Sequence, residues 1–226
     1  MLEAKKNRLF EKIFAVYNTN LMRRKFDSFL VSDIGKLRAQ RSVPQIVVAN
    51  HTGWWDGLVA FELSTHLGLD SYVMMEEKQL RRFWPFTRLG AFSVVREDPR
   101  SAAESIRYAS ELLGDDPERS LWIFPQGELI PFGSRPMNLF PGFARIIEQV
   151  GECRLVPLTI RYEYLKAHRA SIIVSVGDVM NVTISGRDHR KELVSYLARL
   201  LTESEDGLRQ KITSQQLSDD FIDILR

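Results

Sequence analysis

Short runs of apolar and β-branched residues alternate with longer helical stretches along most of the chain. Two parallel neighbouring strands need a crossover connection, which is usually a helix. The alternation therefore predicts an α/β domain, with a mixed, largely parallel sheet that is flanked by helices and buried on both faces. Strands are expected at residues 45–49, 71–75, 92–95, 120–124, 155–162 and 170–176, and helices near 56–68, 78–89, 100–114, 142–150 and 188–204, with a further helix in the tail after Gly207.

The first thirty residues differ in charge from the rest of the chain. They hold seven Lys and Arg residues against three acids, a charge of +4, and since the whole chain carries +2, residues 31–226 sum to −2. Such a basic helix either packs on its own domain or lies among anionic lipid headgroups, and both hold if only part of its apolar stripe is covered. We therefore expect an amphipathic, membrane-associating segment over residues 1–30 and a globular domain over 31–226. The apolar stripe at helical spacing consists of Leu9, Phe10, Ile13, Phe14, Tyr17 and Leu21.

Composition limits the chemistry that is available. The single cysteine, Cys153, excludes an internal disulfide, and no Cys/His cluster has the spacing of a zinc site. No apolar run approaches the roughly 18 residues that a membrane-spanning helix needs, and the first residues lack the order of a signal peptide. We expect a cytoplasmic protein that is peripheral on a membrane and has neither a metal nor a resident cofactor.

A histidine and an aspartate follow the first expected strand, five residues apart. His51 stands at the carboxyl end of the strand, where α/β folds bind ligands, and Asp56 begins the next helix. If the chain turns at Gly53, the carboxylate can orient the imidazole while the other ring nitrogen takes a proton from a hydroxyl group. The alternative is that Asp56 only caps the helix and His51 is an ordinary loop residue, since this spacing alone is a weak signal.

A second segment, residues 90–96, ends a strand in an arginine. Arg96 is either structural or a contact for an anionic headgroup, because the planar guanidinium suits phosphate. Residues 78–96 contain five cations and no acid, interleaved with aromatic residues, which is typical of a headgroup interface. Nucleic-acid-binding proteins share this mixture, but the charge of −2 over residues 31–226 disfavours a nucleic-acid partner.

A third segment, residues 124–128, follows the fourth expected strand and leads into a loop rich in proline and aromatic residues. A Pro-x-Gly turn after a strand exposes backbone N–H groups that can bind an acceptor or a developing oxyanion, and a plain turn is the alternative. The residues that we expect to bind an acceptor are Arg96, Gln126, Gly127, Glu128 and Arg135.

Taken in order, these segments resemble the motifs of the lysophospholipid acyltransferase family, which includes the 1-acylglycerol-3-phosphate acyltransferases. The similarity covers roughly residues 46–161. Asn50-His51 through Asp56 matches the family's Asn-His-x4-Asp block, and Gly90 through Arg96 is similar to its Gly-x-x-Phe-x-x-Arg block, with the aromatic residue in a shifted register. Phe124, Pro125 and Gly127 match its Phe-Pro-Glu-Gly-Thr-Arg block, and Leu155-Val156-Pro157-Leu158 looks like its fourth block.

The resemblance implies an acyltransferase domain over residues 31–226. In this reaction a fatty acyl group passes from an acyl thioester, acyl-CoA or acyl-ACP (acyl carrier protein), to a hydroxyl of a lysolipid or related membrane alcohol. The same resemblance implies that His51 is the general base and that Asp56 orients it. It implies no covalent acyl-enzyme. The lack of a Gly-x-Ser-x-Gly motif agrees with direct attack.

Three positions depart from the family's third block. Gln126 replaces a glutamate, Glu128 a threonine, and Leu129 an arginine that is implied to bind the acceptor's phosphate. Leucine cannot hold an anion, so either Arg96 and Arg135 do so or the acceptor differs from lysophosphatidate. The altered block also leaves open a non-catalytic lipid-binding protein of the same fold, although the retained histidine and aspartate favour an enzyme.

Overall fold

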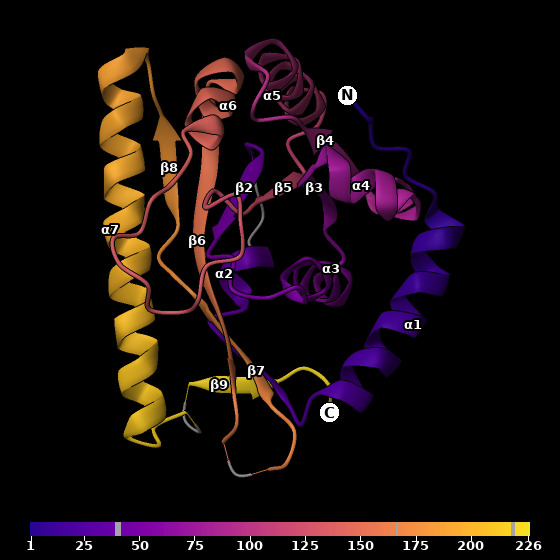
Figure 1. Ribbon diagram of the computed structural model, residues 1–226, viewed down its shortest axis with the longest axis vertical. Coiled ribbons are helices and arrows are strands. Elements are labelled where there is room, and N and C mark those ends of the chain that lie inside the picture. Colours follow the sequence, from indigo (N-terminus) through magenta and orange to yellow (C-terminus); the bar gives the residue numbers. More distant parts are fainter. Residues whose placement is uncertain (39–41, 166, 218–219) are drawn as a thin grey trace.

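One nine-stranded sheet organises the computed structural model, which describes residues 1–38, 42–165, 167–217 and 220–226 (Figure 1). Its strands follow the order β4-β3-β5-β2-β6-β7-β1-β9, and β8 pairs with the first part of β6. The bounds are β1 (Phe29–Ser32), β2 (Gln45–Ala49), β3 (Asp70–Glu76), β4 (Ala91–Val94), β5 (Arg119–Ile123), β6 (Glu152–Glu163), β7 (Ser171–Val176), β8 (Met180–Thr183) and β9 (Phe221–Asp223).

The predicted sheet type is confirmed, since parallel and antiparallel pairings are combined and the parallel ones dominate. β2 lies between β5 and β6 and is parallel to both, and β3 is parallel to β4 and β5. β6 pairs with β7 and β8 in antiparallel fashion, and β9 pairs so with β1. The central position of β2 explains its uninterrupted apolar sequence, because every one of its residues is buried.

Helices cover both faces of the sheet, and the residues of β2 divide between two cores. Val47 and Ala49 pack with α1 and α3, whereas Ile46 and Val48 face α5, α6 and α7, as expected for a strand whose side chains alternate. Figure 1 shows α7 and α1 at opposite sides of the molecule, with the sheet between them. The helices are α1 (Arg8–Lys25), α2 (Gly35–Arg38), α3 (Asp56–Leu67), α4 (Glu77–Arg82), the 3-10 helix η1 (Trp84–Leu89), α5 (Pro99–Gly114), α6 (Gly142–Val150) and α7 (Gly186–Thr213).

Two of the predicted helices were wrong in extent. The helix expected at 78–89 is broken at Phe83 into α4 and η1, because Pro85 has no N–H and its ring would clash with the carbonyl of Arg81 in a continuous helix. The separate helix expected after Gly207 is the last part of α7, where burial of Leu208 offsets the low helix propensity of glycine. The tail then forms β9, and residues 218 and 219 lie outside the described residues.

The sequence analysis missed four short elements, β1, β8, β9 and α2, each of three or four residues. Elements of this length lack a readable period, and β1 and β9 are held by pairing with strands far along the chain. The domain boundary expected after residue 30 falls inside β1, and the division into two functional segments remains a prediction.

The apolar stripe of α1 is only partly covered. Phe14 packs edge-on against Phe61 of α3, with ring centroids 5.1 Å apart, whereas Leu9, Ile13 and Tyr17 are exposed. Polar contacts fix the same helix to α3: Asn18 Nδ2 and Thr19 Oγ1 donate to the buried Glu62 carboxylate over 2.7 and 2.6 Å. The helix therefore packs on its own domain and still presents apolar side chains to the outside.

None of the helices in the described part of the chain is both long and apolar enough to cross a membrane.

Candidate active site

The carboxyl end of β2 carries the first site residues. Asn50, fully buried, connects this end to β6: it accepts from the Ile160 N–H over 2.7 Å and donates to the Ile160 carbonyl and to Glu205 of α7. The backbone is therefore held from two sides just before it leaves the sheet, and the next residue, His51, begins the turn toward α3.

His51 and Asp56 meet as predicted. The Nδ1 atom of His51 lies 2.8 Å from Oδ2 of Asp56, which is the first residue of α3 and is fully buried. The backbone N–H groups of Thr52 and Gly53 donate to the same oxygen over 2.7 and 2.9 Å. Asp56 thus closes the turn before α3 and contacts the imidazole, whereas no side chain caps the start of the helix, so the alternative in which Asp56 only caps the helix was wrong. With Nδ1 occupied, Nε2 is the ring nitrogen left for chemistry.

Tyr162, at the end of β6, is a site residue that the sequence analysis missed. Its hydroxyl donates to Oδ1 of Asp56 over 2.5 Å. Burial raises the pKa of Tyr162 well above its usual value, and the charge of Asp56 raises it further, so the hydroxyl keeps its proton and remains a donor. No sequence signal could have found this contact, because 106 residues separate the partners.

The ring of Tyr162 also explains Gly53. A Cβ atom at Gly53 would lie 2.8 Å from the ring, and Gly53 is not among the residues with positive φ. The chain turns here as expected, and glycine is not required for a left-handed backbone conformation. It is needed because the aromatic ring approaches the backbone too closely for any side chain.

The third segment holds His51 in place. Gln126 Oε1 accepts from the His51 N–H over 2.6 Å, and the Ile130 N–H donates to the His51 carbonyl over 2.8 Å. The imidazole stacks on Phe124, with centroids 4.7 Å apart. Gln126 is buried, so its carbonyl oxygen is used for the protein's own backbone, and it is not among the residues that line the adjacent cavity.

Arg96 lies against the same segment. Its guanidinium is 5.0 Å from the centroid of the Phe140 ring, and a Cβ atom at Gly127 would fall 2.0 Å from Nη1. Gly127 also has a φ of 73°. Both facts require glycine here, one for backbone conformation and one for the close approach of the arginine.

Arg135 lies elsewhere. Its guanidinium donates to the buried Glu205 over 2.7 Å and to Asp206 over 3.2 Å, both on α7. It is not among the residues that line the cavity beside His51, whereas His51, Arg96, Gly127 and Glu128 are. The structure therefore brings together most of the predicted site but leaves Arg135 in an ion-pair network with α7.

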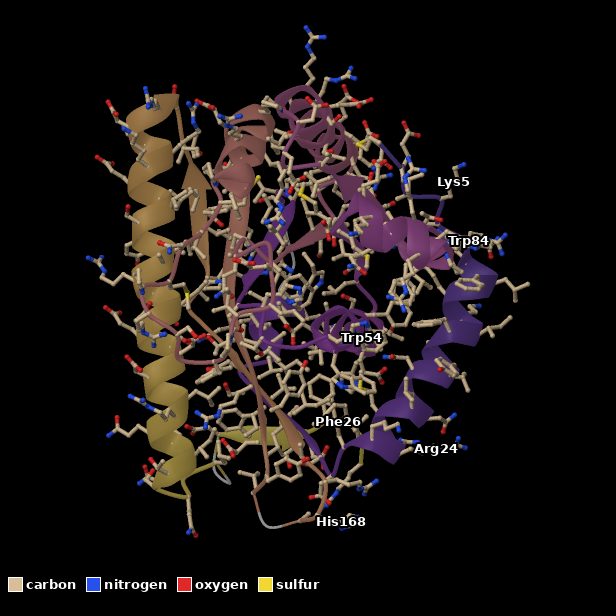
Figure 2. All side chains as sticks on the ribbon, viewed as in Figure 1. Lys5, Arg24, Phe26, Trp54, Trp84 and His168 are labelled. Atoms are coloured by element: carbon tan, nitrogen blue, oxygen red, sulfur yellow. The ribbon has the colours of Figure 1, made fainter. Side chains whose placement is uncertain are left out.

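A cavity of about 940 Å³ begins at His51 and extends between α3, β3 and the residues of α1 that face them. Its volume lies at the upper end of the roughly 300–1,000 Å³ typical of ligand pockets. Figure 2 labels Trp54, which lines it, and Trp84 on the side of the molecule where α1 lies. Most of its lining is apolar and includes Leu58, Phe61, Tyr72, Met74, Phe86, Ile106, Trp122 and Phe124.

Neither a metal site nor a reactive thiol is found in the described part of the chain. No group of three or more His, Cys, Asp or Glu residues could hold a metal ion there. Cys153 is buried in β6, and this burial raises the pKa of its thiol to about 12, so little thiolate forms at neutral pH.

The family follows from a comparison with known proteins. The model of the family described as Acyltransferase matches residues 31–161, which is more than half of the chain. This chain belongs to the acyltransferase family. The match contains His51, Asp56, Arg96 and residues 124–130, and it confirms the resemblance seen in the motifs.

A sequence relative agrees with this assignment, and a solved structure shares the fold. The chain is 34% identical over 119 residues to the 1-acyl-sn-glycerol-3-phosphate acyltransferase of Streptococcus pneumoniae (strain ATCC BAA-255 / R6), covering 50% of this chain and 40% of the relative. It therefore spans less than half the length of that protein. The crystal structure of the 1-acyl-sn-glycerophosphate (LPA) acyltransferase PlsC from Thermotoga maritima shares the fold, with a TM-score of 0.62, 16% identity, and coverage of 88% of this chain and 79% of that one.

We predict that Gly53→Ala destabilises the protein, because its Cβ would collide with the Tyr162 ring. Overpacking of this kind costs about 1–3 kcal/mol. Gly57→Ala, four residues later in α3, meets nothing within 4 Å and should be neutral or slightly stabilising. Urea unfolding of the two variants measures the difference, and equal stability would contradict the close approach.

Proposed function

We propose that the protein is an acyltransferase that moves a fatty acyl group from an acyl thioester to a hydroxyl of a lysolipid or related membrane alcohol. The observation that carries the proposal is the 2.8 Å contact between His51 and Asp56 on the wall of a largely apolar cavity. The reaction needs a base for the hydroxyl group and an apolar volume for an acyl chain, and this arrangement offers both. Membership of the acyltransferase family supports the same reaction.

In the proposed mechanism His51 acts first as a base and then as an acid. Nε2 takes the proton of the acceptor hydroxyl as its oxygen attacks the thioester carbonyl, and Asp56 stabilises the imidazolium that forms. A carbon–oxygen bond forms, the carbon–sulfur bond breaks, and the proton passes from Nε2 to the departing thiolate. Tyr162 holds the other oxygen of Asp56 throughout. The thiol carrier is coenzyme A or acyl carrier protein.

We further propose that the exposed face of α1 docks the protein on a membrane. Four apolar residues of this face, Leu9, Ile13, Val16 and Tyr17, are between 57% and 70% exposed, and Trp54 and Trp84 are exposed as well. Basic residues accompany them, including Arg88, whose guanidinium stacks on Trp84. Apolar and aromatic side chains flanked by cations suit the boundary between headgroups and acyl chains.

We predict that His51→Ala lowers acyl transfer by about 10² to 10⁴-fold, the usual contribution of a positioned general base, and that Asp56→Asn has a smaller effect in the same direction. Release of free thiol and the labelled product formed from a total lipid extract measure the rate. His66→Ala, at an exposed position in α3, is the matched control. A folded His51→Ala protein with near-wild-type turnover would overturn the mechanism. Wild-type protein that binds lysolipid without transferring acyl groups would instead support the non-catalytic alternative.

We predict that Tyr162→Phe lowers kcat by roughly 10- to 100-fold, since it removes a hydrogen bond to a charged group and leaves Oδ1 of Asp56 without this donor. The KM for the thioester should not change, because Tyr162 is not among the residues that line the cavity. Tyr164→Phe, at a position 69% exposed, is the control. Because the pKa of Tyr162 is raised, the wild-type rate should show no loss from its deprotonation on the alkaline side. An unchanged kcat would mean that Asp56 does not depend on this contact.

We predict that Tyr17→Glu weakens binding to anionic liposomes by roughly tenfold, because it removes an aromatic anchor and adds a negative charge to the basic face. Tyr196→Glu makes the same change on α7, at the opposite side of the molecule, and should leave binding intact (Figure 1). Co-sedimentation at several salt concentrations distinguishes them. Equal binding of the two variants would rule out α1 as the docking surface.

A further inference from the structure

Arg96 and Glu128 are two of the charged residues that line the cavity, and both lie at the loop that is bonded to His51. Arg96 contacts Gly127, and Glu128 is the next residue along the chain. This loop is tied to His51 on both sides of Glu128, by the side chain of Gln126 and by the backbone N–H of Ile130. Both charged side chains therefore line the same cavity as His51, at the loop that holds it.

The positive charge of Arg96 is available to bind an anion. Within the described residues its guanidinium makes no ion pair, and its contacts are the Phe140 ring and the Gly127 backbone. It also lines the cavity. A guanidinium group is a planar fork of N–H donors that suits phosphate oxygens.

Glu128 is equally unpaired. It is exposed, lines the cavity, and within the part of the chain that the structure describes it has neither a hydrogen bond nor an ion pair. Leu129, next to it, lines the same cavity and is 52% exposed, so this stretch adds no second cation. Arg145 also lines the cavity and is a second cation there. A doubly charged phosphate monoester bound at Arg96 would nevertheless lie next to Glu128, whose charge would repel it.

We infer that the acceptor is a lysophospholipid with a zwitterionic headgroup, whose phosphodiester binds Arg96 and whose ammonium group binds Glu128. The inference rests on the proposed function and names its substrate class. In such a lipid the free hydroxyl, the phosphodiester and the ammonium follow one another outward from the glycerol, so a hydroxyl bound at His51 leaves the two charged groups for Arg96 and Glu128. Trp54, an exposed aromatic side chain that lines the cavity, would add a cation–π contact to the ammonium group.

The test is a competition between acceptors with one acyl thioester donor. Lysophosphatidylethanolamine, lysophosphatidate, lysophosphatidylglycerol and a monoacylglycerol glycoside, all with the same acyl chain, are mixed in neutral detergent, and the acylated products are quantified together. Wild-type protein should favour lysophosphatidylethanolamine over lysophosphatidate by tenfold or more. Glu128→Gln should lower this ratio about tenfold, and Glu128→Lys or Leu129→Arg should shift it further toward lysophosphatidate. Glu97→Gln, at an exposed position beside Arg96 that does not line the cavity, should leave the ratio unchanged.

The outcomes separate this inference from the proposed function. Preference of the wild-type protein for lysophosphatidate, lysophosphatidylglycerol or the glycoside would overturn the zwitterionic acceptor while leaving the acyltransferase proposal intact. A product ratio that Glu128→Gln does not change would also overturn it. Absence of transfer to every acceptor would overturn both. If the Glu128→Asp protein keeps the wild-type product ratio while Glu128→Gln does not, this would support the role of the carboxylate itself.

Discussion

The buried carboxylate of Asp56 is the constraint on which the rest of the site depends. A charge removed from water is costly unless hydrogen-bond donors surround it, and here four donors do so. The imidazole and two backbone N–H groups meet one oxygen, and Tyr162 meets the other. Three of these come from the turn after β2, but the fourth comes from the end of β6. The turn can therefore be completed only in a folded sheet in which β6 lies beside β2.

A second buried carboxylate ties the site to α7. Glu205 is 2% exposed and accepts from Asn50, from the Gly133 N–H and from Arg135. The loop that follows the third motif is thereby fastened to the same helix that supports the start of the His51 turn. Arg135 belongs to this network and contributes its positive charge to it. Its charge balances a carboxylate that would otherwise be buried without a cation, and this explains why it lies away from the cavity.

The sequence predicted those parts of the fold and site that depend on local pattern. Long apolar runs such as 45–49 and 155–162 became strands, and residues 142–150 became α6, because each carries a full period of buried side chains. The His51–Asp56 pair was predictable because one short turn contains both residues. What could not be predicted depends on contacts between distant segments: Tyr162 with Asp56, Arg135 with α7, and the strands β1 and β9 with each other. In these cases the partner, rather than the residue's own neighbours, determines its role.

The three departures from the family's third motif differ in their physical consequences, and this difference is informative. Gln126 is buried, and what its position requires is an oxygen that accepts from the His51 N–H, which an amide supplies as well as a carboxylate does. An amide also avoids a second buried negative charge in the site, so this exchange keeps the hydrogen bond to His51 at no electrostatic cost. Glu128 and Leu129 are exposed to the cavity, where a change of charge costs the fold little and alters what binds. The buried departure therefore keeps the contact that holds His51, and the exposed departures are the ones that change the charge at the cavity.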